Sequence, residues 1–408
     1  MRGFPFLLAA ILVGACHVGV PGAARQSGNA GSRFLFVWAG DADKRESDFL
    51  AVVDVDPRSA GYASVVKTLP VGATGTRPHH TDYDMPAGGV LWANGFDSGQ
   101  TFRFDLRDPA NPRLVGSFGA AEPFSHPHSY ARLANGHVLA TFQHRLGAGP
   151  VETGGLVEFD GDGRVLRTAS AAAPAIDAGV RPYSLIVVPA LDRIVSTAAD
   201  MHQETRSRAV QIWRLSDLTL IKTILLPPGP RGDENAMTAE PRVLEDGRTV
   251  LVNTFTCGLY RVQGLAGDAP TAEWVYSTPW HEPPYCAVPV VAGHFWLQTN
   301  GPEHAVITLD ISDPGHPKET GRLTLRPDEI PHWIAREPNG DRVVITGYGA
   351  IESRVLLATL DRATGALRLD TTFTTPGAER PGVDFARERW PHGSTGRAIP
   401  HGAVFDRP

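Results

Sequence analysis

This 408-residue chain contains a repeated sequence pattern, and five of its histidines lie at or next to the start of that pattern. A short run that opens with Pro-His or Pro-Tyr leads to a glycine turn and then to an apolar strand. Gly136 lies eight positions after His128, and Gly340 lies eight positions after His332. The histidines are His79, His80, His128, His332 and His401. Imidazoles that converge without carboxylates suit copper, zinc, nickel or iron, whereas calcium requires several carboxylate or amide oxygens. These residue types predict a transition-metal site if the fold brings them together.

The elements that must position these histidines are strands of a repeated hairpin. Asn135-Gly136 and Asn339-Gly340 are typical hairpin turns, and 43 Gly and 34 Pro residues suit a chain with many turns. Strands are expected in clusters over residues 34–71, 90–118, 130–169, 183–226, 241–277, 287–325 and 333–373. The later clusters have four strands each, which is typical of propeller blades. The sequence therefore predicts an all-β fold, a seven-bladed β-propeller.

The first cluster lacks a strand, and a strand without a partner follows the last cluster. Residues 34–71 supply three strands, while Ile399–Phe405 repeats the Pro-His opening with no strand after it. A C-terminal strand that completes an N-terminal blade closes the ring and protects the sheet edges. We predict that residues 399–405 pair with residues 34–39, and that one propeller domain spans residues 34–408.

The innermost strands of a propeller surround a central channel, so equivalent positions at their starts form one ring. Those positions are His79 or His80, His128, Tyr183, Ala239 or Glu240, Tyr285, His332 and His401. We predict that the five histidines hold a metal, and that His332 is also catalytic. Glu240 is expected to be a catalytic residue. It could act as a general base, bind the metal, or accept a hydrogen bond from an imidazole N–H. The alternative is a ring of histidines that bind water in a wet channel.

Charge and motifs argue against several other classes of function. The formal net charge is −6 and no stretch is rich in Lys and Arg, so we expect no nucleic-acid partner. The sequence contains no P-loop, no G-x-S-x-G motif and no dinucleotide-binding fingerprint. Carboxylates are scarce at the ring positions, which disfavours a lactonase-like hydrolase.

Two further features lie outside the repeated pattern. Cys257 and Cys286 are too few for a disulfide framework, and we predict that they are buried small apolar residues. The sequence does not decide whether a single disulfide links them. Residues 376–398 form an insertion rich in Gly, Pro and Arg. Its Trp390 and His392 fit a cap over the channel and a surface loop equally well.

The N-terminal residues have the character of an export signal. Arg2 precedes an apolar run over residues 4–13, which is too short to span a membrane comfortably. Residues 1–24 are predicted to be a signal peptide or lipoprotein signal, and residues 25–33 a polar tether. Either Cys16 becomes a lipidated N-terminus or cleavage follows Ala24. We expect an exported protein, periplasmic or lipid-anchored in a bacterial envelope, with membrane contact only through Cys16.

Several segments resemble the selenium-binding protein family, which includes the copper-dependent methanethiol oxidases. The segments are residues 34–40 (FLFVWAG), 48–57 (DFLAVVDVDP), His79-His80, 309–314 (LDISDP) and 339–346 (NGDRVVIT). Residues 37–40 stand where animal relatives carry a cysteine associated with selenium, and this chain has no cysteine there.

The resemblance implies a seven-bladed propeller with a copper ion bound by His79, His80, His128 and His401. It also implies a small thiol such as methanethiol and O2 as substrates, with formaldehyde, hydrogen sulfide and hydrogen peroxide as products. Zinc or another transition metal is the alternative to copper. A metal-binding or protein-binding propeller without turnover is the alternative to an enzyme.

Overall fold

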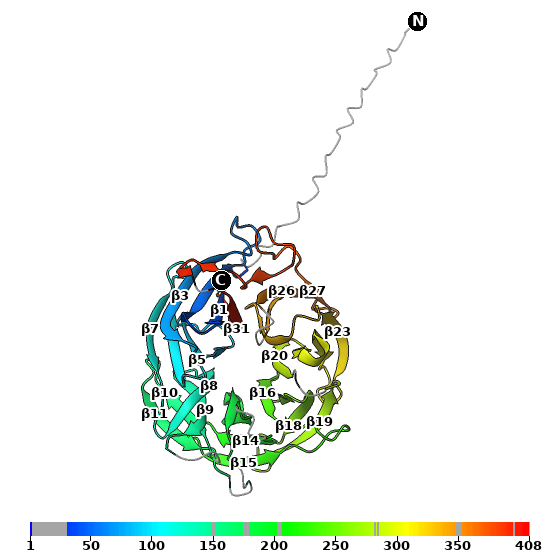
Figure 1. Cartoon of the computed structure of the whole chain (residues 1–408). Helices are drawn as coiled ribbons and strands as arrows, with labels where there is room; N and C mark the ends of the chain where they lie inside the picture. The colour runs from blue at the N-terminus through cyan, green and yellow to red at the C-terminus, as the bar shows by residue number, and fades with distance from the viewer. Residues whose placement is uncertain are drawn as a thin grey trace. The chain divides into compact units, whose positions relative to one another are not determined.

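Seven antiparallel sheets surround a central axis in the computed structural model of this chain (Figure 1). The structure describes residues 1, 31–147, 152–173, 176, 179–201, 206–280, 283, 285–347, 353–394 and 396–407. Residues 31–408 form one compact unit. The predicted all-β, seven-bladed propeller is confirmed. The predicted signal segment, Cys16 and the tether up to residue 30 lie outside the described residues, and no described helix is both long and apolar enough to cross a bilayer.

In each blade the first strand named lies at the channel and the last lies at the outer edge. Blade 1 contains β31 (Ala398–Phe405), β1 (Phe34–Asp41), β2 (Ser47–Asp54) and β3 (Val65–Thr74). Blade 2 contains β4 (Pro78–Thr81), β5 (Val90–Gly95), β6 (Gln100–Asp105) and β7 (Arg113–Phe118). Blade 3 contains β8 (Phe124–Arg132), β9 (Val138–Arg145), β10 (Gly155–Phe159) and β11 (Val165–Ser170). Blade 4 contains β12 (Pro182–Val188), β13 (Arg193–Ala198), β14 (Ala209–Arg214) and β15 (Leu220–Leu225).

The remaining blades follow the same order. Blade 5 contains β16 (Thr238–Val243), β17 (Val250–Thr254), β18 (Gly258–Gln263) and β19 (Thr271–Ser277). Blade 6 contains β20 (Cys286–Ala292), β21 (Phe295–Asn300), β22 (Ala305–Asp310) and β23 (Lys318–Thr324). Blade 7 contains β24 (Pro331–Arg336), β25 (Arg342–Gly347), β26 (Arg354–Leu360), β27 (Leu367–Leu369) and β28 (Val383–Asp384). Two 3₁₀ turns, η1 (Pro189–Leu191) and η2 (Gly301–Glu303), and the hairpin of β29 (Arg389–Trp390) and β30 (Gly393–Ser394) complete the fold.

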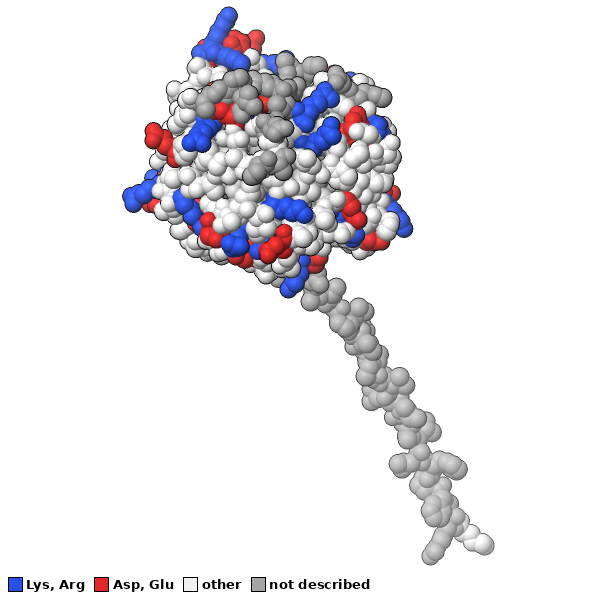
Figure 2. Space-filling model, turned by 90° about the horizontal axis from the view of Figure 1, so that it is seen from below, with Lys and Arg blue, Asp and Glu red and all other residues white. Residues whose placement is uncertain are grey.

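The hydrophobic core lies between neighbouring blades because each sheet buries both faces. Between blades 1 and 2, for example, the ring of Trp38 lies 5.4 Å from that of Phe102 and 5.5 Å from that of Phe104. The outermost strands instead alternate exposed and half-buried residues, as in β7. Over the face in Figure 2, the described acidic and basic side chains are interspersed and form no large patch of one sign.

The ring is closed by the strand that follows the last blade in sequence. β31 pairs antiparallel with β1, with Leu35 opposite Phe405 and Phe36 opposite Val404, as predicted. Consecutive innermost strands contact one another around the channel, including β24 with β31 and β31 with β4. Blade 1 is therefore built from both ends of the propeller sequence.

Two predicted strand limits were wrong by four residues or more. The innermost strand of blade 3 begins at Phe124, not at residue 130, because the Pro127 segment already pairs with β9. The outermost strand of blade 7 ends at Leu369, not at residue 373, because Phe373 turns into the core and is fully buried.

The insertion packs against blades 7 and 1, because β28 pairs with β26 while Trp390 and His392 lie against blade 1. The ring of Trp390 lies 4.6 Å from that of Phe49 in β2, and His392 Nδ1 lies 2.7 Å from Thr68 Oγ1 in β3. Phe385 packs on Trp390 from within the insertion, 5.0 Å away. Trp390 is therefore part of the buried core at blade 1, and His392 is half-buried against β3.

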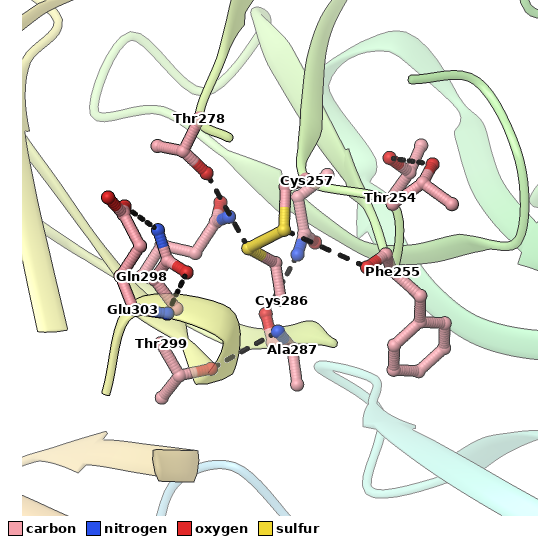
Figure 3. The surroundings of a disulfide bond; sticks show 12 residues. Thr254, Phe255, Cys257, Thr278, Cys286, Ala287, Gln298, Thr299 and Glu303 are labelled. Atoms are coloured by element: carbon pink, nitrogen blue, oxygen red, sulfur yellow. Dashed lines mark hydrogen bonds between the residues drawn. A yellow bond between two sulfur atoms is a disulfide. The ribbon is translucent and has the colours of Figure 1, made fainter. Parts of the chain in front are cut away.

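Cys257 and Cys286 form a disulfide that joins blades 5 and 6 (Figure 3). Both residues are buried, as predicted, and the single bridge that the sequence left open is formed. They are 29 positions apart in the sequence, and the packing of adjacent blades brings their Cα atoms to 5.1 Å. Cys286 N–H also donates to the Phe255 carbonyl, 3.1 Å away.

Replacing both cysteines with alanine should lower the free energy of unfolding by about 3–4 kcal/mol. The bridge closes a loop of 29 residues, which restricts the unfolded chain by this order of magnitude. Urea unfolding measures the effect, and reduced wild-type protein should match the double variant. Equal midpoints for oxidised wild type and the variant would contradict the expected contribution.

Candidate metal centre

A β-bulge interrupts each innermost strand at the same level. In β4, Pro78 pairs with Gly95 and Thr81 with Ala93, so that two consecutive residues stand opposite one residue of β5. The bulge residues are His79 and His80, His128 and Ser129, Tyr183 and Ser184, Ala239 and Glu240, Ala287 and Val288, His332, and His401 and Gly402. A bulge breaks the alternation of a strand and redirects side chains. This is how adjacent residues such as His79 and His80 both reach the channel.

A polar side chain on the second strand of a blade secures the bulge and links it to the next blade. Asn94 accepts a hydrogen bond from His80 N–H (2.6 Å) and donates one to the Pro127 carbonyl (3.0 Å). Thr141 makes the same two contacts between β8 and β12. Thr197, Asn253 and Thr299 repeat them, and Thr346 donates to the His401 carbonyl. The level of each bulge is thereby fixed relative to its neighbour.

The bulges bring all five predicted histidines into one buried cluster. The ring centroids of His79 and His401 are 4.2 Å apart, those of His80 and His128 are 4.3 Å apart, and those of His332 and His401 are 4.9 Å apart. Two groups of three could each hold a metal ion: His79 with His80 and His128, and His79 with His332 and His401. Within each group the ligand nitrogens lie within 4.8 Å of one another. His79 belongs to both groups.

The tautomer of His128 is fixed by its surroundings. Its Nδ1 lies 2.8 Å from the Tyr183 carbonyl oxygen, which can only accept, so Nδ1 carries the proton. Nε2 is then an unprotonated nitrogen, and this buried atom has no hydrogen-bond partner among the described residues. A backbone carbonyl that holds one imidazole nitrogen while the other is left with a lone pair is typical of metal-binding histidines. The donor set therefore fits a transition-metal ion.

Burial keeps the imidazoles neutral. It lowers the pKa of His128 to about 3, despite the hydrogen bond to Tyr183, and lowers the pKa of His332 to about 3. Burial also lowers the pKa values of His79, His80 and His401 well below the ordinary value, and the neighbouring histidines add to this effect. Neutral imidazoles are the form that binds metal ions, so protons do not compete near neutral pH.

The metal-free protein should lose stability as the pH falls below about 6.5. An unfolded histidine binds a proton near that pH, whereas His128 and His332 in the folded state bind one only near pH 3. The unfolded state therefore holds more protons between these limits, and each such histidine lowers the free energy of unfolding by about 1.4 kcal/mol per pH unit. Urea unfolding of metal-free protein from pH 7 to pH 5 tests this, and His128→Asn should reduce the slope. A stability that is constant over this range would contradict the neutral cluster.

Glu240 lies beside the cluster but belongs to neither group of three. Its Oε2 accepts hydrogen bonds from Tyr83 (2.6 Å), Ser184 (2.7 Å) and Arg242 (2.8 Å). Its Oε1 lies 3.9 Å from His80 Nδ1 and accepts no hydrogen bond among the described residues. Glu240 is thus placed to act on the cluster through His80.

Two tyrosines contact His80, of which only Tyr183 was a predicted ring position. The hydroxyl of Tyr83 lies 3.3 Å from His80 Nδ1, and the hydroxyl of Tyr183 lies 3.1 Å from His80 Nε2. Arg242 shares a strand face with Glu240, because alternate residues of a strand lie on the same side, and this signal was available. No pattern in the sequence points to Tyr83. Tyr285 was wrongly placed in the ring, because the bulge of blade 6 falls on Ala287 and Val288.

The fold and the bulges define this protein as a seven-bladed propeller with a histidine cluster at its axis. Among solved structures, a hypothetical selenium-binding protein from Sulfolobus tokodaii superposes with a TM-score of 0.75, at 17% identity and over 93% of this chain and 94% of that one. The periplasmic gluconolactonase of Pseudomonas aeruginosa superposes with a TM-score of 0.63, at 11% identity and over 92% of this chain and 99% of that one. At these identities the similarity establishes the fold alone.

Sequence comparison adds a particular relative. The chain is 38% identical over 108 residues to a methanethiol oxidase of Hyphomicrobium sp, a match that covers 25% of this chain and 24% of that protein. The chain thus matches about a quarter of the length of this curated relative. No family model matches the chain. The predicted resemblance to the selenium-binding proteins and methanethiol oxidases is confirmed by these similarities.

Proposed function

We propose that this protein is a copper-dependent oxidase of a small thiol, with methanethiol as the first substrate to test. The observation that carries the proposal is the buried cluster of five neutral imidazoles, in which the lone pair of His128 Nε2 has no hydrogen-bond partner among the described residues. The sequence similarity to a methanethiol oxidase gives the reaction class, and the match is confined to a quarter of each chain.

Copper would supply the redox change that oxidation of a thiol by O2 requires, which zinc lacks. The reaction to be tested converts methanethiol, O2 and water to formaldehyde, hydrogen sulfide and hydrogen peroxide. His79, His80, His128, His332 and His401 would hold the ion. Glu240 Oε1 would accept the thiol proton as a general base, since this oxygen has no hydrogen-bond partner among the described residues and lies beside His80.

Oxygen uptake tests the proposal directly. Protein loaded with copper under reducing conditions and freed of unbound metal should consume O2 when methanethiol is added, with one formaldehyde formed per O2. The same protein loaded with zinc is the matched control and should consume none. Stoichiometric copper without methanethiol-dependent uptake would overturn the enzymatic assignment.

A metal-binding propeller without turnover is the second candidate function. The observation that favours it is the burial of the cluster, because none of the five histidines is more than 9% exposed. A substrate thiol must come close to the ion, whereas a stored ion requires no such approach. This candidate predicts bound copper with no uptake of oxygen.

Replacing His332 with alanine should separate ligation from turnover. His332 is the most exposed of the five histidines and pairs with His79 and His401 in only one of the two groups. We expect copper to be retained while methanethiol-dependent oxygen uptake falls by at least tenfold. Metal analysis and oxygen uptake on the same sample make the measurement. Loss of copper together with activity would instead make His332 a required ligand.

We also propose that the protein is exported. The apolar run over residues 4–13 is typical of an export signal. The disulfide between Cys257 and Cys286 also supports export, because structural disulfides persist in oxidising compartments. Mass spectrometry of the mature N-terminus distinguishes lipid-modified Cys16 from cleavage after Ala24. Full-length protein recovered from the cytoplasm would refute export.

A further inference from the structure

A cavity of about 840 Å³ lies beyond the bulges along the innermost strands. Its walls include Leu185–Val187 of β12, Val290 and Val291 of β20, and Ile334 and Arg336 of β24, all downstream of the bulge in their strand. The histidines do not line it. Tyr83 and Arg242 do, and both contact Glu240, so this polar layer separates the cavity from the cluster.

The cavity wall carries four arginines and two aspartates, and most of these charges are neutralised within the wall. Arg132 makes two hydrogen bonds to Asp82 (2.8 and 2.6 Å). Arg242 is paired with Glu240 and lies 4.2 Å over the ring of Tyr83. The charges of Arg336, Arg407 and Asp84 are not neutralised by such a pair, so the wall has one net positive charge.

The guanidinium groups of Arg336 and Arg407 have no carboxylate within 4.0 Å in the part of the chain that the structure describes. Arg407 Nε donates to the Met85 carbonyl (2.6 Å), and Arg336 makes one long contact to the Gly340 carbonyl (3.5 Å). Asp84 shares their surroundings: desolvation raises its pKa, and the charges of Arg242, Arg336 and Arg407 oppose that rise. Most N–H groups of the two arginines therefore remain available to a ligand.

Much of the rest of the wall is aliphatic, and Tyr83 and Tyr130 add two aromatic rings. Val90, Leu133, Leu185, Val243 and Val291 line the cavity together with Ile334. Guanidinium groups bind carboxylates through paired N–H donors, and an aliphatic wall adds affinity in proportion to the apolar area covered. A cavity of this size is typical of small-molecule sites.

We infer that this cavity is a second ligand site, and that it binds a small organic carboxylate whose charge pairs with Arg336 and Arg407 and whose aliphatic body lies against Leu185, Val243 and Val291. The inference does not rest on the proposed oxidase function, because Arg336, Arg407 and Asp84 have no contact with the histidine cluster among the described residues. Inorganic phosphate, which has charge but no aliphatic body, should bind much more weakly.

Isothermal titration of the full chain with butyrate, hexanoate, hexanamide and phosphate tests the inference. We expect one hexanoate per chain and affinity that rises about fourfold for each added methylene. Hexanamide, which lacks the charge, should bind at least tenfold more weakly than hexanoate. Phosphate that binds as tightly as hexanoate, or hexanoate that shows no saturable binding, would overturn the assignment.

Variants locate the site. Arg336→Gln and Arg407→Gln should each weaken hexanoate binding by about tenfold or more, because each removes a charged donor. Asp84→Asn should strengthen binding, since it removes the opposing charge from the wall. Arg362→Gln is the matched control, because Arg362 is exposed, pairs with Asp341 and does not line the cavity. Copper content should be unchanged in all four variants. Wild-type affinity in both arginine variants and in Asp84→Asn would refute the site.

Discussion

Replacing His128 with alanine should remove bound copper and methanethiol-dependent oxygen uptake together, while the propeller still folds. Nε2 of His128 is the cluster nitrogen whose lone pair is fixed by the protein, through the hydrogen bond from Nδ1 to the Tyr183 carbonyl. Removing a ligand should weaken copper binding by more than the ten- to hundredfold typical of residues that only support a ligand. His401→Ala should have the same effect, because His401 completes the second group of three.

Folding should survive these substitutions because each side chain points into the channel and not between blades. Copper analysis after loading with Cu(I), oxygen uptake and thermal melting should be made on the same preparations. His316→Ala is the matched control, since His316 is exposed and pairs with Asp313 in a loop. Variants of His128 and His401 that bind copper as tightly as wild type would disprove the metal site. Variants that do not melt cooperatively would be replaced by His128→Asn and His401→Asn.

Deleting residues 398–408 should abolish cooperative folding. The deletion removes β31, the innermost strand of blade 1, and leaves β1 with an unpaired edge beside the channel. It also removes Val404 and Phe405 from two hydrophobic clusters, which costs about 3–6 kcal/mol before the lost strand hydrogen bonds at about 1 kcal/mol each are counted. The sum is comparable with the whole stability of a typical domain, about 5–15 kcal/mol.

Calorimetry or circular dichroism on heating measures this loss. Removal of residues 407 and 408 alone is the control, because β31 ends at Phe405 and stays intact. A synthetic peptide of residues 398–408 added to the truncated chain should restore a cooperative transition by occupying the edge of β1. An unchanged melting transition in the truncated protein would show that β31 is dispensable for closure.

The propeller fold could be predicted mainly from the hairpin turns and the Pro-His runs of the sequence. Asn135-Gly136 and Asn339-Gly340 mark hairpins by backbone conformation alone, since residues such as Asn339 and Gly136 adopt a positive φ there. The strand without a partner at residues 399–405 predicted how the ring of blades is closed. The recurrence of histidine at one place in the repeat then located the cluster without any distance information.

Other features of the site depend on distances that the sequence does not encode. Local pattern does not reveal a bulge, so the sequence left open whether His79 or His80 faces the channel, and both do. The disulfide depends on how far blade 5 is from blade 6 at Cys257 and Cys286. Asn94 and Thr141, which secure the bulges, recur at equivalent places in their strands, and this recurrence is visible in the sequence.

The bulge at His401 has a consequence for how the protein is made. The histidine cluster draws on residues from position 79 to position 401, and its last member lies on the strand that also closes the ring. During synthesis the first four histidines emerge long before the fifth, and they cannot adopt the observed arrangement until β31 reaches β1. Any ion that requires all five side chains is therefore acquired after translation of the propeller is complete, and for an exported chain after translocation. Cofactor supply in the compartment of folding, and not in the compartment of synthesis, would then determine which metal the proposed site binds.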